Sequence, residues 1–184
     1  MSCTVSTKSG RAVELRFLST DDRSGLVGFF SSLSPQALQW GMPPYTEEVI
    51  DRWIGNLANL IALVAVHGKA IVGYAMISKG THPRRQGVGD LAIYLHQDFQ
   101  NDGLGTAMLR RLLALAKDEG LHKVTVHVIA DNKPAVSLYE KLGLQHEGTL
   151  KDSYLGGDNR YHDELVLGLV FADSKGGGDF LTRS

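Results

Sequence analysis

The chain has 184 residues, of which 43% are hydrophobic and 21% are charged, and its formal net charge is -1. These values are those of a globular protein with one core, and the small net charge creates no field that would attract a nucleic acid or an anionic membrane. No apolar run approaches the ~20 residues that span a bilayer, and the opening residues MSCTVSTKSG are too polar for a signal peptide. The single cysteine, Cys3, favours a reducing compartment. We therefore expect a cytoplasmic protein with no nucleic-acid or membrane partner.

The two ends of the chain differ in composition from the middle. Residues 1–10 are small and polar, and residues 172–184 include three consecutive glycines. Both compositions are typical of flexible segments. We predict one folded domain over residues 11–171, between a flexible N-terminus and a flexible Gly-rich tail.

Strand and helix signals alternate along the first half. Val13–Leu18 alternates apolar and polar residues, which predicts a first strand. N-cap candidates at residues 19–22, and again at Thr46, begin helices. Two apolar strands joined by a Gly68-Lys69 turn follow, and then a third strand over Leu91–His96.

In the second half, a polar segment leads into a helix that Gly120 ends. The strand KVTVHVIA comes next, then a helix from Pro134 to Gly143, and then strand-like segments over residues 146–154 and 161–170. The order is β, helices, β-β-β, α, β, α, β-β. It predicts an α/β (α+β) fold, in which one mixed sheet of about 6–7 strands carries helices on both faces.

Two glycines two residues apart, Gly103 and Gly105, open the helix that follows the polar segment DFQND. Glycine lets backbone amides approach a ligand closely, because no Cβ stands in the way. A helix N-terminus adds unpaired N–H groups and the positive end of the helix dipole. Such a turn suits a phosphate, although an ordinary tight turn would have the same residues.

A second segment, ADNKPAVSLYEKLGL, spans Ala130–Leu144 and follows a predicted strand. By itself it is a capped helix with residues that pack. Together with the glycine turn, however, it is similar to the two signatures of the GNAT N-acetyltransferase superfamily. QNDGLG resembles the Q/R-x-x-G-x-G/A acetyl-CoA loop, and DNKPAVSLYEKLG resembles the N-x-x-A-x-x-L-Y-x-K-x-G segment. The resemblance covers about residues 11–170 and implies a single GNAT-like domain.

Different parts of the chain resemble different GNAT subgroups. The stretches FFSSLSPQAL and GVGDLAIYLHQDFQNDGLG look most like the GNAT domain of bacterial protein-lysine acetyltransferases. The stretch HEGTLKDSYLGGDNRYHDELVLGL looks more like ribosomal-protein and polyamine acetyltransferases. These subgroups differ in the acceptor, so the resemblance leaves the acceptor open.

The resemblance implies acetyl-CoA as the cofactor. The backbone amides of the loop would hold its pyrophosphate, the main chain of the preceding strand would bond its pantetheine arm, and Asn132 would contact the same arm by its side chain. Asp102 departs from the family pattern because a carboxylate repels a pyrophosphate; we expect it to point to solvent, or cofactor binding to be weaker than usual. The cofactor-binding residues implied are Tyr94, Leu95, His96, Gln100, Asn101, Asp102, Gly103, Leu104, Gly105, Thr106 and Asn132.

Two residues match catalytic positions of the family. Tyr139 matches the general-acid tyrosine, and a phenol of pKa about 10 is protonated at neutral pH; a packing role is the alternative. Asp90, ten residues before Gln100, matches the glutamate base of the lysine-acetylating relatives. Its shorter side chain favours a water relay, and a loop carboxylate without a role is the alternative. The lesser candidates for the base are Glu47, Glu48 and His96, and no histidine spacing indicates a metal site.

We predict an acetyl-CoA-dependent N-acetyltransferase that acts by direct attack in a ternary complex on a primary amine, either a protein lysine or an N-terminal amine. The segment WGMPPY (Trp40–Tyr45) is a candidate wall of the acceptor pocket, and a homodimer is left open. One alternative is a small-molecule amine acceptor, a polyamine or an antibiotic. Another is a non-catalytic acyl-CoA-sensing module, which Tyr139 disfavours because a sensor needs no acid. A dinucleotide-binding oxidoreductase is disfavoured because the third glycine of its motif is missing.

Overall fold

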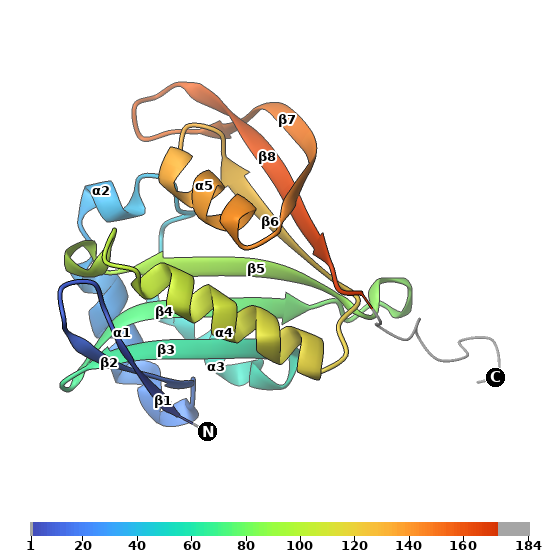
Figure 1. The fold of residues 1–184 in the computed structure, drawn as a ribbon. Helices are drawn as coiled ribbons and strands as arrows, with labels where there is room; N and C mark the ends of the chain where they lie inside the picture. Colours follow the sequence, from blue (N-terminus) through green and yellow to red (C-terminus); the bar gives the residue numbers. More distant parts are fainter. Residues whose placement is uncertain (1, 173–184) are drawn as a thin grey trace.

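The protein, seen here as a computed structural model that describes residues 2–172, is built on one eight-stranded sheet in the order β1-β2-β3-β4-β5-β6-β8-β7 (Figure 1). The strands are β1 (Cys3–Ser6), β2 (Ala12–Phe17), β3 (Leu60–His67), β4 (Ala70–Lys79), β5 (Val88–Leu95), β6 (Lys123–Ile129), β7 (Gln145–Leu155) and β8 (Tyr161–Val170). The α-helices are α1 (Arg23–Ser32), α2 (Pro35–Leu38), α3 (Glu47–Gly55), α4 (Leu104–Asp118) and α5 (Lys133–Lys141). Four 3-10 turns are η1 (Thr20–Asp22), η2 (Leu57–Asn59), η3 (Pro83–Arg85) and η4 (Gln97–Phe99).

The predicted fold class and element order are confirmed from β2 onward, and the extra strand is β1. The prediction that residues 1–10 are flexible was wrong for Cys3–Ser6, which pairs antiparallel with β2. Four residues give too few alternations to stand out from a polar loop, and the pairing with β2 supplies the stability that the pattern does not reveal. The predicted tail lies outside the described residues except for Ala172.

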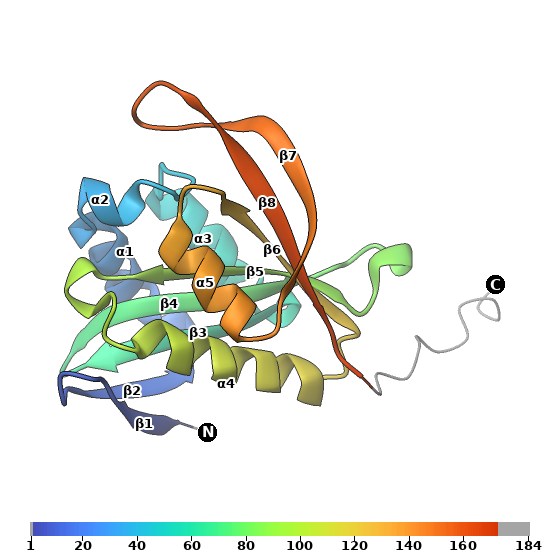
Figure 2. The same cartoon turned by 45° about the horizontal axis from the view of Figure 1, so that its top comes forward.

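The central strand β3 serves two cores. Its residues Ile61, Leu63 and Ala65 pack in the core that contains α4, whereas Ala62 and Val64 pack in the core that contains α1 and α3. Side chains on a strand point alternately to the two faces of the sheet, so one apolar strand supports helices on both sides. Figure 2 shows α4 and α5 in front of the sheet, with α1 and α3 behind it.

The two halves of the sheet join through a short parallel pairing. β5 and β6 pair only over Val88–Asp90 and Lys123–Thr125. Beyond that point β6 continues with β8 over its whole length, and the unit of β6, β7, β8 and α5 turns away from β5 (Figures 1 and 2). The far half of β5 is therefore left with an open edge.

An aromatic cluster supports that half of β5 from behind. The ring of Phe30, from α1, lies 4.6 Å from Tyr45, 5.5 Å from Trp53, 6.1 Å from Tyr74 and 5.2 Å from Tyr94, centroid to centroid. Edge-to-face and tilted aromatic pairs at these distances add about 0.5–1.5 kcal/mol each beyond the area that they bury. The cluster holds β5 in place on the face opposite α4.

The entry into α1 is fixed by a buried carboxylate. Asp22 is 8% exposed; it accepts hydrogen bonds from both guanidinium nitrogens Nη1 and Nη2 of Arg16, at 2.7 and 2.6 Å, and from the main-chain N–H of Ser19 at 2.9 Å. The hydrogen bonds from Arg16 hold the pKa of Asp22 below its ordinary value. A carboxyl whose pKa is lowered on folding stabilises the protein above the unfolded pKa, and that stabilisation is lost as the pH falls through the folded pKa.

We expect Asp22→Asn to lower the free energy of unfolding by about 2 kcal/mol at pH 7, the scale of hydrogen bonds to a charged group. The difference from the parent should shrink as the pH falls below about 4, because the parent carboxylate is then protonated too. Urea unfolding at several pH values measures both effects. Asp21→Asn, at an exposed neighbouring position, is the control. Equal losses in the two variants would contradict the role of Asp22.

Candidate functional site

A cavity of about 550 Å³ opens beside β5, beyond the point where β6 leaves it. Its walls come from β5, the loop before α4, the first turn of α4, one face of α5, the segment around α2, and Lys8. Lys8 and Lys141 are the charged residues among those described that line it, and both are cations. The predicted cofactor-binding residues that line the cavity are Tyr94, Leu95, Gln100, Asn101, Gly103, Gly105, Thr106 and Asn132.

The hydrogen-bond register of β5 decides which main-chain groups face this cavity. His96 donates its N–H to the carbonyl of Val72 at 2.9 Å, and its own carbonyl accepts from the N–H of Phe99. In an antiparallel ladder every second residue exchanges hydrogen bonds with the partner strand. Tyr94, opposite Tyr74, therefore also bonds to β4.

The residues between these positions have the opposite orientation. Ile93 and Leu95 direct their N–H and C=O groups away from β4, toward the side that β6 has left. The carbonyl of Leu95 accepts from the side-chain amide of Gln100 at 3.2 Å. The main-chain prediction was thus wrong for Tyr94 and His96; Leu95 remains, and Ile93 was missed because alternation of side chains does not reveal the direction of main-chain hydrogen bonds.

The N-terminus of α4 opens onto the same cavity. Gly103, the N-cap, has a φ of +85°, a left-handed conformation that suits glycine. The first helical hydrogen bond runs from the N–H of Ala107 to the carbonyl of Gly103, so the N–H groups of the first turn have no partner within the helix. A Cβ on Gly105 would come within 3.1 Å of Leu95 and 3.4 Å of Leu138, so its absence lets the helix start approach β5 and α5. Leu104 is 1% exposed and points into the core, which leaves only its main chain for a ligand.

Asp102 does not point to solvent, so that expectation was wrong. Its carboxylate accepts from the N–H and the hydroxyl of Ser9, at 2.7 and 2.6 Å, and from Arg11 at 2.7 Å. These groups hold the pKa of Asp102 well below its usual range. The partners lie more than 90 positions away, in the turn between β1 and β2, and no local pattern could have indicated them.

Asn132 and Tyr139 are about two turns apart on α5. Asn132 lines the cavity and caps the helix, because its Oδ1 accepts from the N–H of Ala135 at 3.4 Å. Tyr139 is 5% exposed and belongs to the core beneath α4 and α5. Burial raises the pKa of Tyr139, and burial is also the main reason that the pKa of Tyr94 is raised. Tyr139 is therefore a protonated phenol, and it is buried in the core rather than among the residues that line the cavity.

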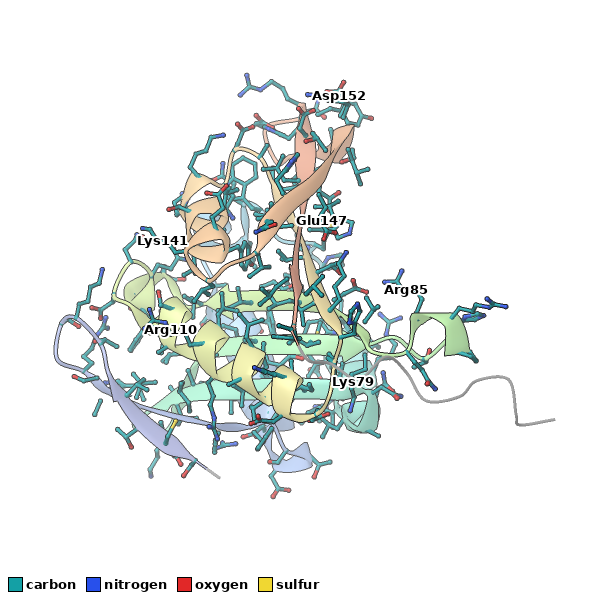
Figure 3. All side chains as sticks on the ribbon, turned by 45° about the vertical axis from the view of Figure 1, so that its right-hand side comes forward. Lys79, Arg85, Arg110, Lys141, Glu147 and Asp152 are labelled. Atoms are coloured by element: carbon teal, nitrogen blue, oxygen red, sulfur yellow. The ribbon has the colours of Figure 1, made fainter. Side chains whose placement is uncertain are left out.

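The predicted base, Asp90, lies elsewhere. It stands at the other end of β5, where its carboxylate accepts from Thr125 Oγ1 at 2.5 Å and lies 3.6 Å from Arg85. Arg85, which is close to Asp90, and the cavity residue Lys141 lie on opposite sides of the molecule in Figure 3. The Asp90 side chain is 56% exposed. Burial or a neighbouring acid makes a carboxylate a stronger base. In the described part of the chain the side chain of Asp90 has neither, and it contacts an alcohol and a cation instead.

The segment predicted to wall the acceptor pocket is held by β7. Trp40 and Gly41 line the cavity, and Tyr154 donates its hydroxyl to the carbonyl of Gly41 at 2.7 Å. Tyr45 instead belongs to the aromatic cluster, and its hydroxyl accepts from the N–H of Met42 at 2.7 Å. Tyr154 could not be found from the sequence, because 113 positions separate it from its partner.

A second cavity, of about 490 Å³, adjoins the first at Trp40. Its wall includes His162, which contacts Asp131 at 2.7 Å and Asp158 at 3.0 Å, and these carboxylates raise the pKa of the imidazole. The two cavities thus share Trp40 as a wall residue, and the second is lined mainly by polar residues from the segment after α2 and from the β7–β8 hairpin.

Comparison with known proteins agrees with this geometry. Residues 26–144 match the acetyltransferase (GNAT) family. The chain belongs to the GNAT family. Both predicted motifs lie within the matched residues, and the predicted superfamily is confirmed.

Individual relatives of this GNAT protein are moderately similar. It is 33% identical over 123 residues to an L-amino acid N-acetyltransferase of Escherichia coli (strain K12), which covers 64% of this chain and 75% of that enzyme. It is 31% identical over 77 residues to the ribosomal protein bS18-alanine N-acetyltransferase of the same strain, which covers 42% of this chain and only 51% of that enzyme. A Salmonella typhimurium protein solved with its cofactor acetyl-CoA has the same fold, with a TM-score of 0.78 at 18% identity over 90% of this chain and 97% of the other.

The GNAT family uses acetyl-CoA, so this chain is an acyltransferase with acetyl-CoA as its cosubstrate. The cavity fits that molecule because its charged wall residues are cations and the open N–H groups of α4 suit a phosphate. Within residues 2–172, no helix is both long and apolar enough to cross a membrane.

We expect Thr106→Glu to weaken acetyl-CoA binding on the order of 100-fold or more, because a carboxylate on the cavity wall would repel the phosphates by several kcal/mol. A glutamate in the first turn of a helix interacts favourably with the helix dipole, so the thermal midpoint should not fall. Thr106→Gln, which has the same shape without the charge, should lose far less. Titration calorimetry and thermal unfolding of both variants check this. Equal affinities in the Glu and Gln variants would place the phosphates elsewhere.

Proposed function

We propose that this GNAT enzyme acetylates an α-amino group, that of an N-terminal residue or of an amino acid. The observation that carries the proposal is the environment of Asp90, the one family-matched candidate for a base. Its carboxylate is half exposed, bonded to an alcohol and next to a cation. If Asp90 does not act as a general base, the acceptor must be an amine that loses its proton readily near neutral pH.

The pKa of the acceptor amine decides how much help is needed. A lysine amine, of pKa about 10.4, is neutral at pH 7 only to a fraction of order 10⁻³ to 10⁻⁴, which costs about 4–5 kcal/mol. The α-amine of a peptide N-terminus, of pKa about 8, is neutral to roughly one tenth, which costs about 1.4 kcal/mol. The difference from lysine is about 3 kcal/mol, and it is comparable to what a well-placed general base contributes. The α-amine of a free amino acid lies between the two, because its own carboxylate raises its pKa.

The names of two relatives support the same class of acceptor. One acts on L-amino acids and the other on an alanine of a ribosomal protein. Alanine has no side-chain nitrogen, so the nitrogen acetylated there is an α-amine. The first relative is matched over three quarters of its length and the second over half, which supports the chemical class of the acceptor and no particular molecule.

The residues around the cavity then have different roles in the acyl transfer. The neutral amine attacks the thioester carbonyl carbon, and the C–N bond forms as the C–S bond breaks. The nitrogen then loses one proton, which passes through solvent to the departing thiolate, and the thiolate needs a hydrogen bond as it forms. The main-chain groups of Ile93 and Leu95 hold the donor in extended form along the open edge of β5, as an added strand would be held. The hydroxyl of Tyr139 donates a hydrogen bond to the departing thiolate. Because burial raises the pKa of Tyr139, a hydrogen bond from its hydroxyl to the developing thiolate is favoured over full proton transfer.

A thiol-release assay with acetyl-CoA tests the acceptor. Four acceptors separate the possibilities: a lysine-free peptide with a free N-terminal alanine, free alanine, an N-terminally blocked peptide with one lysine, and a polyamine. We expect turnover with the first or the second and little with the last two. Turnover confined to the lysine peptide or the polyamine would overturn the proposal.

We expect Tyr139→Phe to lower kcat by roughly 10- to 1000-fold, the range for loss of one proton donor. The affinity for acetyl-CoA should stay within a factor of about 2 because the ring still fills its place in the core. Steady-state kinetics and calorimetry on the same preparation separate the two quantities. If binding and turnover fall together, Tyr139 is a packing residue.

We expect kcat/KM for the peptide with a free N-terminal alanine to rise with pH through about 8, as the α-amine itself loses its proton. Asp90→Asn should leave the position of this limb unchanged, since the limb belongs to the acceptor. pH–rate profiles of parent and variant provide the comparison. A limb displaced by Asp90→Asn would make Asp90 the base and would return the lysine acceptor to first place.

A further inference from the structure

The cofactor loop itself lacks a positive charge. Between Gln100 and Thr106 the one charged residue is Asp102, an acid. Phosphates are usually met by cations as well as by amide N–H groups. The family motif accounts for the glycines of this loop, but it does not account for how the loop tolerates a carboxylate beside a pyrophosphate.

The turn between β1 and β2, residues 7–11, provides the positive charges that the loop lacks, on Lys8 and Arg11. The N–H of Lys8 donates to the carbonyl of Asp102 at 2.9 Å, and Ser9 and Arg11 bond to its carboxylate. Arg11 also donates to the carbonyl of Asp98 at 2.7 Å, and its guanidinium lies 3.9 Å from the centre of the Phe99 ring. Figure 1 shows this hairpin next to the loop that leads into α4.

Lys8 is well placed for the ligand. It is exposed, it lines the cofactor cavity, and no ion pair within residues 2–172 involves its amine. A Cβ built on Gly103 would lie 3.5 Å from Lys8 Cγ and 3.8 Å from its Cε. The aliphatic stem of the lysine therefore runs along the N-cap of α4, beside the N–H groups that a phosphate would meet. Lys141, the other cation of the wall, belongs to α5.

We propose that the β1–β2 turn is part of the cofactor site, with Lys8 binding the pyrophosphate of acetyl-CoA and Arg11 acting as a positioning residue that neutralises Asp102. The pyrophosphate is chosen over the 3′-phosphate because Lys8 lies against Gly103, at the helix start itself. The inference rests on acetyl-CoA as the donor and is independent of the acceptor, so a failure of the α-amine proposal leaves it intact.

Calorimetric titration of the full chain with CoA and with dephospho-CoA tests Lys8 without any acceptor. Lys8→Met keeps the stem and removes the charge; we expect it to bind both ligands about 5- to 20-fold more weakly than the parent, and the deficit to shrink in high salt. Lys69→Met, at the exposed turn between β3 and β4, is the matched control and should change neither affinity. Unchanged binding in Lys8→Met would overturn the proposal. A loss for CoA but not for dephospho-CoA would overturn the pyrophosphate assignment and move Lys8 to the 3′-phosphate.

A double-mutant cycle tests Arg11. Arg11→Met should weaken CoA binding by about tenfold or more, because it leaves the Asp102 carboxylate uncompensated beside the phosphates. Adding Asp102→Asn to that variant should recover most of the affinity. A purely structural role predicts the opposite, since the double variant has lost still more of the contacts between hairpin and loop. A double variant that binds no better than Arg11→Met would therefore overturn the electrostatic role of Arg11.

Discussion

β5 and β6 run parallel and share only the pairs from Val88–Lys123 to Asp90–Thr125 before they separate. An unpaired main-chain group costs about 1–3 kcal/mol when it is buried without a partner, so an open strand edge inside a sheet needs a reason to persist. β6 finds its partner in β8 along seven residue pairs, and α5 fills part of the gap from the side of α4. The edge of β5 at Ile93 and Leu95 is what remains, and an extended ligand that carries amide groups can satisfy it.

The sequence predicted this region well where the signals are local. The glycine turn, the start of α4 and the capped start of α5 each depend on a few adjacent residues, and each was found where it was expected; the residue that caps α5 is Asn132. The errors at Tyr94 and His96 have one physical origin. Side chains alternate across a strand, which a sequence shows, while main-chain hydrogen bonds alternate within the sheet plane, which depends on the register with β4. Nothing in the composition of the strand fixes that register.

The same limit explains why the N-terminal hairpin was missed. Residues 1–10 are too small and polar to predict a strand, and their contacts are made with a loop more than 90 positions away. Asp102 looked unfavourable because only its neighbours in sequence were visible. In the folded chain its charge is balanced by Arg11, so the departure from the family pattern and the extra strand are two parts of one arrangement.

In the arrangement that we propose, the two substrates are recognised by different means, and this difference sets what can be predicted about each. Main-chain groups and a helix end would hold the cofactor, and a short motif specifies them. The proposed acceptor side depends on side chains brought together from distant elements, such as Trp40, held through Tyr154, and His162 on β8. The α-amine proposal therefore rests on chemistry more than on resemblance: Asp90 is exposed and bonded to Thr125, and a peptide α-amine loses its proton with less help than a lysine amine does.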